Sequence, residues 1–124
     1  MQTTEQMIAT VYAAFNRRDI DLVFIHMHPD VDWPNAMEGG REHGYDQVRA
    51  YWTRQWSTLD PRVEPVRVTE DGAGNTTVDV HQVVCDLAGN VVVDQMVQHV
   101  YSIRDGLIQR MDIRDLPADP AQKR

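Results

Sequence analysis

The segments of this chain divide into two halves with different hydrophobic periods. Three helical patterns occupy the first 59 residues, whereas the residues after Pro61 alternate between apolar and polar as β-strands do. Helices separated in this way from strands are typical of an α+β domain whose helices cover one face of an antiparallel sheet. The sequence therefore predicts a curved antiparallel sheet that forms a cone around three N-terminal helices, with a central pocket.

The three helices have recognisable boundaries. Thr3 and Gln6 fit a capping box that opens the first helix. Asp19 is a suitable N-cap for a short second helix, and Pro29 is expected to end it because the residue before a proline avoids the α region. A third helix is predicted over about 45–58, with Trp52 and other aromatic residues along one side.

Turn residues separate the predicted strands. Asp71-Gly72, Gly89-Asn90 and Asp105-Gly106 are the turn signals of the second half, and the last is a strong hairpin signal. The predicted strands cover 31–33, 41–43, 62–70, 76–87, 91–104 and 107–114. The register of 76–87 stays open, so either His81 or Gln82 points into the pocket. From about residue 117 the tail carries two prolines and is expected to be frayed.

Length and composition restrict the class of molecule. With 124 residues, the chain is predicted to form a single domain spanning 1–124. The net charge of −7 argues against nucleic acid, and no apolar run is long enough to cross a membrane. The single cysteine, Cys85, and the absence of a signal-peptide pattern favour the cytoplasm. No cofactor motif is present, so we expect no cofactor.

Alternation places particular side chains inside the cone. In 91–104, His99 and Tyr101 share an apolar face that should look toward the helices. The same argument turns Leu107, Met111 and Ile113 inward. The outer face should then carry apolar side chains, which predicts a homodimer through that face. The outer apolar residues are Val92, Met96 and Val100.

An ordered set of motifs resembles the nuclear transport factor 2-like superfamily, in particular its ketosteroid-isomerase-like and polyketide-cyclase-like (SnoaL-like) members. The resemblance covers about residues 5–115. It rests on the Asn16-to-Asp21 helix junction, the strand Pro29-to-Trp33, the segment Gly44-to-Trp52, and the hairpin Asp105-to-Ile108. This resemblance implies a pocket but not one activity, because the fold hosts isomerases, cyclases, hydrolases, dehydratases and non-catalytic binders.

The resemblance also implies that most groups of the steroid isomerase site are replaced in this chain, so we expect no steroid isomerisation by that mechanism. The general-base aspartate of the steroid isomerases falls at Asn35, which cannot accept a proton from carbon. Their first-helix tyrosine falls at Val11, beside Tyr12, and their third-helix tyrosine falls at Trp52. The protonated aspartate of their oxyanion hole falls at His99, which can still donate a hydrogen bond.

Three residues are the candidate catalytic groups. His99 titrates near neutral pH in its ordinary state, and Tyr12 could assist it. Asp115 is the third candidate, because polyketide-cyclase-like enzymes use an aspartate on their last strand as an acid or base. Each of the three could instead be structural: a satisfied core histidine, a core tyrosine or a surface carboxylate.

The candidate ligand-binding residues are the side chains expected around the pocket: Trp33, Asn35, Trp52, Trp56, Tyr101 and Met111. The tryptophans could wall a pocket for a ring-containing molecule or simply fill the core. No metal site is expected, because His26 and His28 would lie on different sides of a helix over 22–28. Three functions stay open: a cofactor-free acid/base enzyme acting on a small apolar substrate, a non-catalytic ligand-binding domain, and a protein–protein module.

Overall fold

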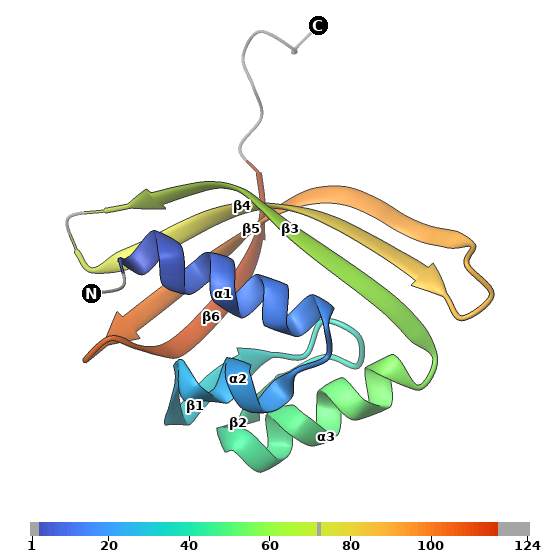
Figure 1. Ribbon diagram of the computed structural model, residues 1–124, viewed down its shortest axis with the longest axis horizontal. Helices are drawn as coiled ribbons and strands as arrows, with labels where there is room; N and C mark the ends of the chain where they lie inside the picture. The colour runs from blue at the N-terminus through green and yellow to red at the C-terminus, as the bar shows by residue number, and fades with distance from the viewer. Residues whose placement is uncertain (1–2, 72, 117–124) are drawn as a thin grey trace, which may run out of the picture.

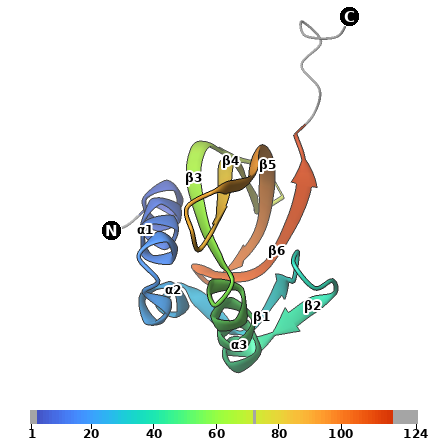
Figure 2. The same ribbon diagram turned by 90° about the vertical axis from the view of Figure 1, so that its right-hand side faces the viewer.

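The computed structural model describes residues 3–71 and 73–116, which form three helices and one six-stranded sheet. The helices are α1 (Thr4–Asn16), α2 (Ile20–Ile25) and α3 (Gly44–Trp56). The strands are β1 (Met27–Pro34), β2 (Arg41–His43), β3 (Leu59–Glu70), β4 (Asn75–Asp86), β5 (Val91–Arg104) and β6 (Leu107–Asp115). All three helices lie on one side of the curved sheet (Figures 1 and 2), which confirms the predicted α+β class. The predicted frayed tail lies outside the described residues, as does Gly72 of the first turn signal.

Local signals explain where most of the helices begin. Thr3 and Gln6 form the predicted capping box, with side-chain and backbone bonds in both directions. Asp19 caps α2 by accepting a hydrogen bond from the backbone N–H of Leu22. The end predicted for this helix was wrong: Pro29 lies inside β1, and α2 ends at Ile25.

Strand pairing, and not the proline, ends α2. The backbone carbonyl of His26 accepts a hydrogen bond from the N–H of Ile108, and Met27 pairs with the same residue of β6. This pairing draws the chain into extended conformation two residues before Pro29. A partner that lies about 80 residues further along the chain cannot be recognised from the local sequence.

The sheet has the order β2-β1-β6-β5-β4-β3 and is open, with β2 and β3 at its edges. Four of its five neighbouring pairs are antiparallel, as predicted, and the pair β1–β6 is parallel. The predicted hairpin at Asp105-Gly106 is present. Both residues have positive φ, 55° and 76°, as a two-residue turn that matches strand twist requires. The sheet is therefore a curved half-shell and not a closed barrel (Figure 2).

The inward face of β5 is the predicted one. His99 and Tyr101 are buried, and His99 pairs with Val78 while Tyr101 pairs with Thr76. Paired residues of neighbouring strands share a face, so the register also decides the orientation of β4. His81 pairs with Met96 and faces outward, whereas Gln82 shares the inner face. The side-chain oxygen of Gln82 accepts a hydrogen bond from the exposed Gln95 at 3.1 Å.

A bulge changes the face of the first residues of β6. Met111 pairs with Tyr101 and is buried as predicted. Two residues after Tyr101 in β5, the register shifts by one residue of β6, so that Ile103 pairs with Ile108. Ile108 therefore points inward, and the inward orientation predicted for Leu107 was wrong. A single extra residue in one strand exchanges the two faces, which strict alternation cannot anticipate.

The outer face of the sheet is more polar than the sequence indicated. Val92 and Met96 are exposed as predicted, but Val100 is only partly exposed. Between them, Gln98 donates a hydrogen bond to Asp79 at 2.8 Å and accepts one from Arg114 at 2.7 Å. Apolar and polar groups therefore alternate on this face, and they do not form one continuous apolar patch. The homodimer through this face stays a prediction.

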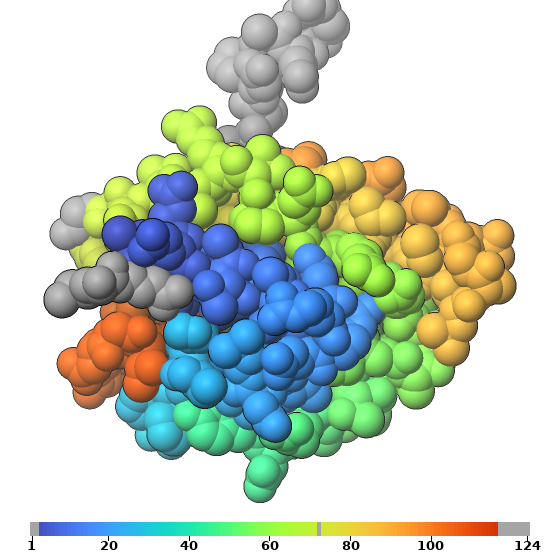
Figure 3. Space-filling model, viewed as in Figure 1, coloured from blue at the N-terminus to red at the C-terminus, as the bar shows by residue number. Residues whose placement is uncertain are grey.

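In Figure 3, α1 and α2 cover the middle of the molecule, and the β4–β5 hairpin projects past the helices. Within residues 3–71 and 73–116, no helix is long and apolar enough to span a bilayer. The same residues hold no cluster of three or more histidine, cysteine, aspartate or glutamate side chains that could bind a metal ion.

Candidate functional site

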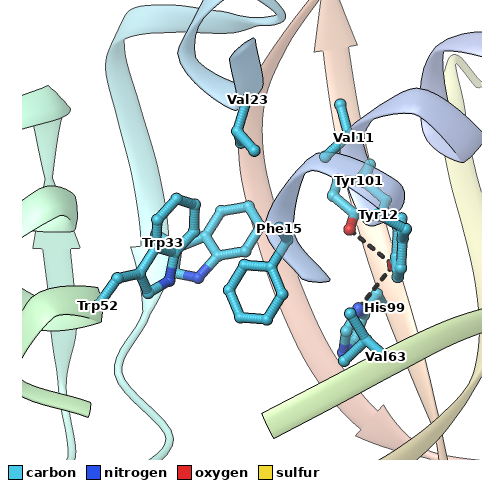
Figure 4. Close-up of a pocket in the computed structure, with 9 residues that line it drawn as sticks. All are labelled: Val11, Tyr12, Phe15, Val23, Trp33, Trp52, Val63, His99 and Tyr101. Carbon is cyan, nitrogen blue, oxygen red and sulfur yellow. Dashed lines mark hydrogen bonds between the residues drawn. The ribbon is translucent and has the colours of Figure 1, made fainter. Parts of the chain in front are cut away.

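A small cavity of about 40 Å³ lies between the helices and the concave face of the sheet (Figure 4). One water molecule needs roughly 10–15 Å³, and pockets for drug-sized ligands measure roughly 300–1,000 Å³. The cavity is therefore large enough for a small group and small for a ligand with several rings. Nine residues from six elements line it: Val11, Tyr12, Phe15, Val23, Trp33, Trp52, Val63, His99 and Tyr101.

One side of the cavity is aromatic. The rings of Trp33 and Trp52 meet edge to face, with centroids 5.5 Å apart and an interplanar angle of 90°. Phe15 packs against Trp52 at 5.3 Å in a similar edge-to-face contact. Such pairs add to the free energy of burial and hold each ring in one orientation. This wall can accept a flat or rounded apolar group but offers it no charge.

The opposite side is a hydrogen-bonded group of three polar side chains. The Tyr12 hydroxyl lies 2.7 Å from Nδ1 of His99 and 2.7 Å from the Tyr101 hydroxyl. His99 and Tyr101 are two apart in β5, so both point inward, and α1 carries Tyr12 across them. Figure 4 shows the group at the end of the cavity away from the tryptophans.

Burial keeps this polar group uncharged at neutral pH. Desolvation lowers the pKa of His99 to about 4. Burial is also the largest cause that raises the pKa of Tyr12 well above its usual value, followed by the nearby Tyr101. The pKa of Tyr101 is raised by burial and partly lowered again by its bond to Tyr12. The cavity thus presents neutral hydrogen-bonding groups on an apolar background, with no carboxylate in its lining.

Four of the nine predicted site residues do not line the cavity. Asn35 is buried in the β1–β2 loop, where its amide donates to Glu38 and Glu42 at 3.0 and 2.9 Å. Its carbonyl oxygen accepts from the backbone of Glu38, so the side chain is used to hold the loop. Met111 packs in the core beside Tyr101, and Asp115 is exposed at the end of β6.

Trp56 is the fourth of these residues and packs behind the aromatic wall. Its ring lies 5.9 Å from that of Trp52 and 5.4 Å from that of Phe15. The guanidinium of Arg18 sits over its outer side at 4.8 Å and also bonds to Asp60. Trp56 Nε1 is sealed from solvent and has no hydrogen-bond partner in the part of the chain that the structure describes. Its role here is to support Trp52.

The five predicted residues that do line the cavity are Tyr12, Trp33, Trp52, His99 and Tyr101. The prediction did not include Phe15 as a site residue, although it lies one helical turn after Val11 on the same apolar stripe. Val63 had no local signal. Its strand lies at the sheet edge, where the Asn16 side chain donates to the Val63 carbonyl and accepts from its N–H, at 2.8 and 3.0 Å.

The comparisons with known proteins agree with this architecture. A family model described as the SnoaL-like domain matches residues 8–111. No curated protein sequence is detectably similar to the chain. Among solved structures, an NTF2-like protein of unknown function from Burkholderia pseudomallei is similar with a TM-score of 0.80 and 24% identity, covering 94% of this chain and 92% of that one.

Two further structures resemble the chain over nearly its whole length. TerC, co-crystallised with polyporic acid, is 26% identical with a TM-score of 0.78, covering 90% of each chain. A putative polyketide cyclase from Pseudomonas putida is 18% identical with a TM-score of 0.76, covering 98% of this chain and 94% of that one. Similarity at such low identity establishes the fold and leaves the activity to the residues of the site.

Proposed function

We propose, from the premise that this chain belongs to the SnoaL-like domain family, that it binds a small and largely apolar molecule in the cavity between helices and sheet. The observation that carries the proposal is the division of the cavity into an aromatic wall and one neutral hydrogen-bonding group. Apolar surface with a few convergent polar groups is the usual make-up of a small-molecule site.

The size of the cavity restricts the ligand. About 40 Å³ suits a compact group such as a small ring, held between Trp33 or Trp52 and the His99 side. The co-crystallisation of TerC with polyporic acid supports a small-molecule ligand in a domain of this fold. A ligand with several rings would have to displace wall side chains, since the aromatic contacts leave little free space.

A cavity-filling substitution tests the proposal. Val63→Phe should fill the space, because Val63 is buried and lines the cavity. Val66→Phe is the matched control: the same change on the same strand, at a side chain that is 62% exposed. Cyclopentanone, followed by chemical-shift changes of the tryptophan indole N–H groups, should bind to the wild type and to Val66→Phe but not to Val63→Phe. Equal behaviour of all three proteins would refute the site.

A cofactor-free acid/base enzyme is the second candidate function. His99 is neutral at pH 7, and its Nε2 forms no hydrogen bond with any described residue, so this nitrogen is free for a substrate. A group with a pKa of about 4 is a weak base, however, and the most effective base titrates near the working pH. Asp115 is exposed and does not line the cavity, so such a reaction would depend on His99 and Tyr12 alone.

Binding is therefore the function that the geometry supports best, and catalysis needs its own test. A product formed from a small cyclic ketone or epoxide, lost in His99→Gln while cyclopentanone still binds, would establish the enzyme. Turnover that is unchanged in that variant would exclude His99 as the proton carrier.

A further inference from the structure

The hydrogen bonds of the polar group have a direction that can be worked out from the number of hydrogens available. Tyr12 carries one hydroxyl hydrogen, yet its oxygen contacts both His99 Nδ1 and the Tyr101 oxygen at 2.7 Å. It can donate to only one of them. Neither Tyr12 nor Tyr101 has another side-chain hydrogen-bond partner within the described ranges.

The two possible directions differ in what they leave unpaired. If Tyr12 donated to Tyr101, the hydroxyl hydrogen of Tyr101 would have no acceptor. Tyr101 is 1% exposed and has no other hydrogen-bond partner among the described residues. A buried donor without an acceptor costs free energy, because its hydrogen bond to water is lost and not replaced. If Tyr101 donates to Tyr12 and Tyr12 donates to His99, every hydroxyl hydrogen is paired. The second direction is therefore the stable one.

This direction determines the tautomer of His99. Nδ1 accepts from Tyr12 and carries no hydrogen, so the hydrogen of the neutral ring must be on Nε2. Nε2 has no partner in the described part of the chain. It is also not sealed, because Trp56 Nε1 is the single sealed and unpaired side-chain polar atom among the described residues. His99 lines the cavity, and its Nε2–H has no hydrogen-bond partner among the described residues, so it is available to a ligand as a donor.

The other nitrogen groups of the lining are also donors. The indole N–H groups of Trp33 and Trp52 form no hydrogen bond with residues 3–71 or 73–116, and neither is sealed. Indole N–H can donate but never accept. The three unpaired nitrogens of the described lining, which belong to His99, Trp33 and Trp52, are therefore all hydrogen-bond donors without an acceptor.

We infer that the ligand of this cavity carries a hydrogen-bond acceptor, such as a carbonyl, ether or epoxide oxygen, which His99 Nε2–H holds. Tyr12 and Tyr101 are positioning residues: their hydroxyls are paired with His99 Nδ1 and with each other, and they fix the ring of His99 as a donor. We expect a protonated amine not to bind, because its ammonium group is itself a donor and cannot accept a hydrogen bond from His99 Nε2–H. Its charge would also be buried in an apolar site without a partner. The inference rests on the proposed binding function and specifies the ligand class.

The tautomer can be measured without any ligand. Long-range ¹H–¹⁵N correlation of His99 at pH 7 should show hydrogen on Nε2 alone. Tyr101→Phe should leave this pattern unchanged, since the Tyr12 hydroxyl still needs Nδ1 as its acceptor. Tyr12→Phe should release the ring, so that the Nδ1–H form appears. If Tyr12→Phe does not fold, the double variant with Tyr101→Phe removes both hydroxyls and leaves none unpaired.

Three probes of one shape test the ligand class: cyclopentanone, methylenecyclopentane and cyclopentylamine. The ketone should bind about fivefold or more tighter than the alkene, as one buried hydrogen bond predicts, and the ammonium form of the amine should not bind. His99→Gln keeps a donor near the position of Nε2 and should retain the ketone preference. His99→Asn reaches only the position of Nδ1 and should lose it.

The outcomes separate this inference from the proposed function. Binding of ketone and alkene with equal affinity, tighter binding of the amine, or an Nδ1–H ring in the wild type would each overturn the donor assignment while the pocket function stands. Failure of all three probes to bind would overturn the proposed function, and the tautomer measurement would still decide the direction of the hydrogen bonds.

Discussion

At the scale of single residues, His99 shows how burial changes the chemistry of a side chain. The ring is stacked beside Tyr12, with centroids 5.9 Å apart, and burial lowers its pKa to about 4. In the unfolded chain a histidine titrates near 6.5. The group that the sequence indicates as a titrating catalyst is thus a neutral polar group in the folded protein.

The lowered pKa of His99 predicts a loss of stability in mild acid. Between pH 6.5 and about 4 the unfolded state binds a proton that the folded state does not, so the free energy of unfolding falls as the pH falls. Full stability is present above pH 6.5, and the loss approaches roughly 3 kcal/mol near pH 4. Urea unfolding at pH 7 and 4.5 should show a smaller decrease in His99→Gln than in the wild type. An equal decrease would contradict the assignment.

The two neighbouring tryptophans of α3 should respond differently to truncation. Trp52 is 2% exposed and contacts Phe15, Phe24 and Trp33, so Trp52→Phe should cost roughly 1–3 kcal/mol. Trp56→Phe also removes a sealed, unpaired N–H, which offsets part of the lost packing, so its cost should stay below about 1 kcal/mol. Denaturant unfolding of both variants measures the difference. A larger cost for Trp56→Phe would argue against this account.

At the scale of elements, the edge strand β3 is protected by its neighbours. Pro61 and Pro65 have no N–H to offer another strand, and Asn16 occupies the N–H and C=O of Val63. Through these bonds Asn16 holds the end of α1 against β3, where Val63 lines the cavity. The same amide therefore protects the edge strand β3 and holds one of the residues that line the cavity.

Removing this amide should loosen one end of β3. Asn16→Ala leaves both backbone groups of Val63 without their partner, and the expected cost is about 1–3 kcal/mol. Amide hydrogen exchange at Val63 should become faster in this variant. Thr58→Ala is the control: its side chain is exposed, and its hydroxyl makes a single 3.4 Å contact, so the change should stay within about 0.5 kcal/mol. Unchanged exchange at Val63 would mean that the amide is dispensable.

At the scale of the whole molecule, the predicted homodimer through the outer face of the sheet can be tested by charge. Met96 is 41% exposed on that face, and Met37, at 43%, lies in the β1–β2 loop. Light scattering at micromolar concentration should give a dimer for the wild type and for Met37→Arg, and a monomer for Met96→Arg, because a buried unpaired charge opposes association. A monomeric wild type would rule out the dimer under these conditions.

The local sequence was sufficient for what depends on neighbours along the chain. The capping box at Thr3, the Asp19 cap and the Asp105-Gly106 turn are decided by bonds within a few residues, and the alternation of β5 turns His99 and Tyr101 inward wherever the helices cover it. Five of the nine predicted site residues accordingly line the cavity.

Only the tertiary structure decided what depends on distant partners. The pairing of Met27 with Ile108 ends α2 before Pro29. The bulge in β6 turns Ile108 inward in place of Leu107. The amide of Asn35 bonds to Glu38 and Glu42 in the β1–β2 loop and does not line the cavity. The hydrogen bonds of the Tyr101–Tyr12–His99 group likewise require Tyr12 to meet His99, which lies 87 residues further along the chain. Sequence patterns report the face of an element, whereas registers and hydrogen-bond partners arise when elements compete for each other's backbone and polar groups.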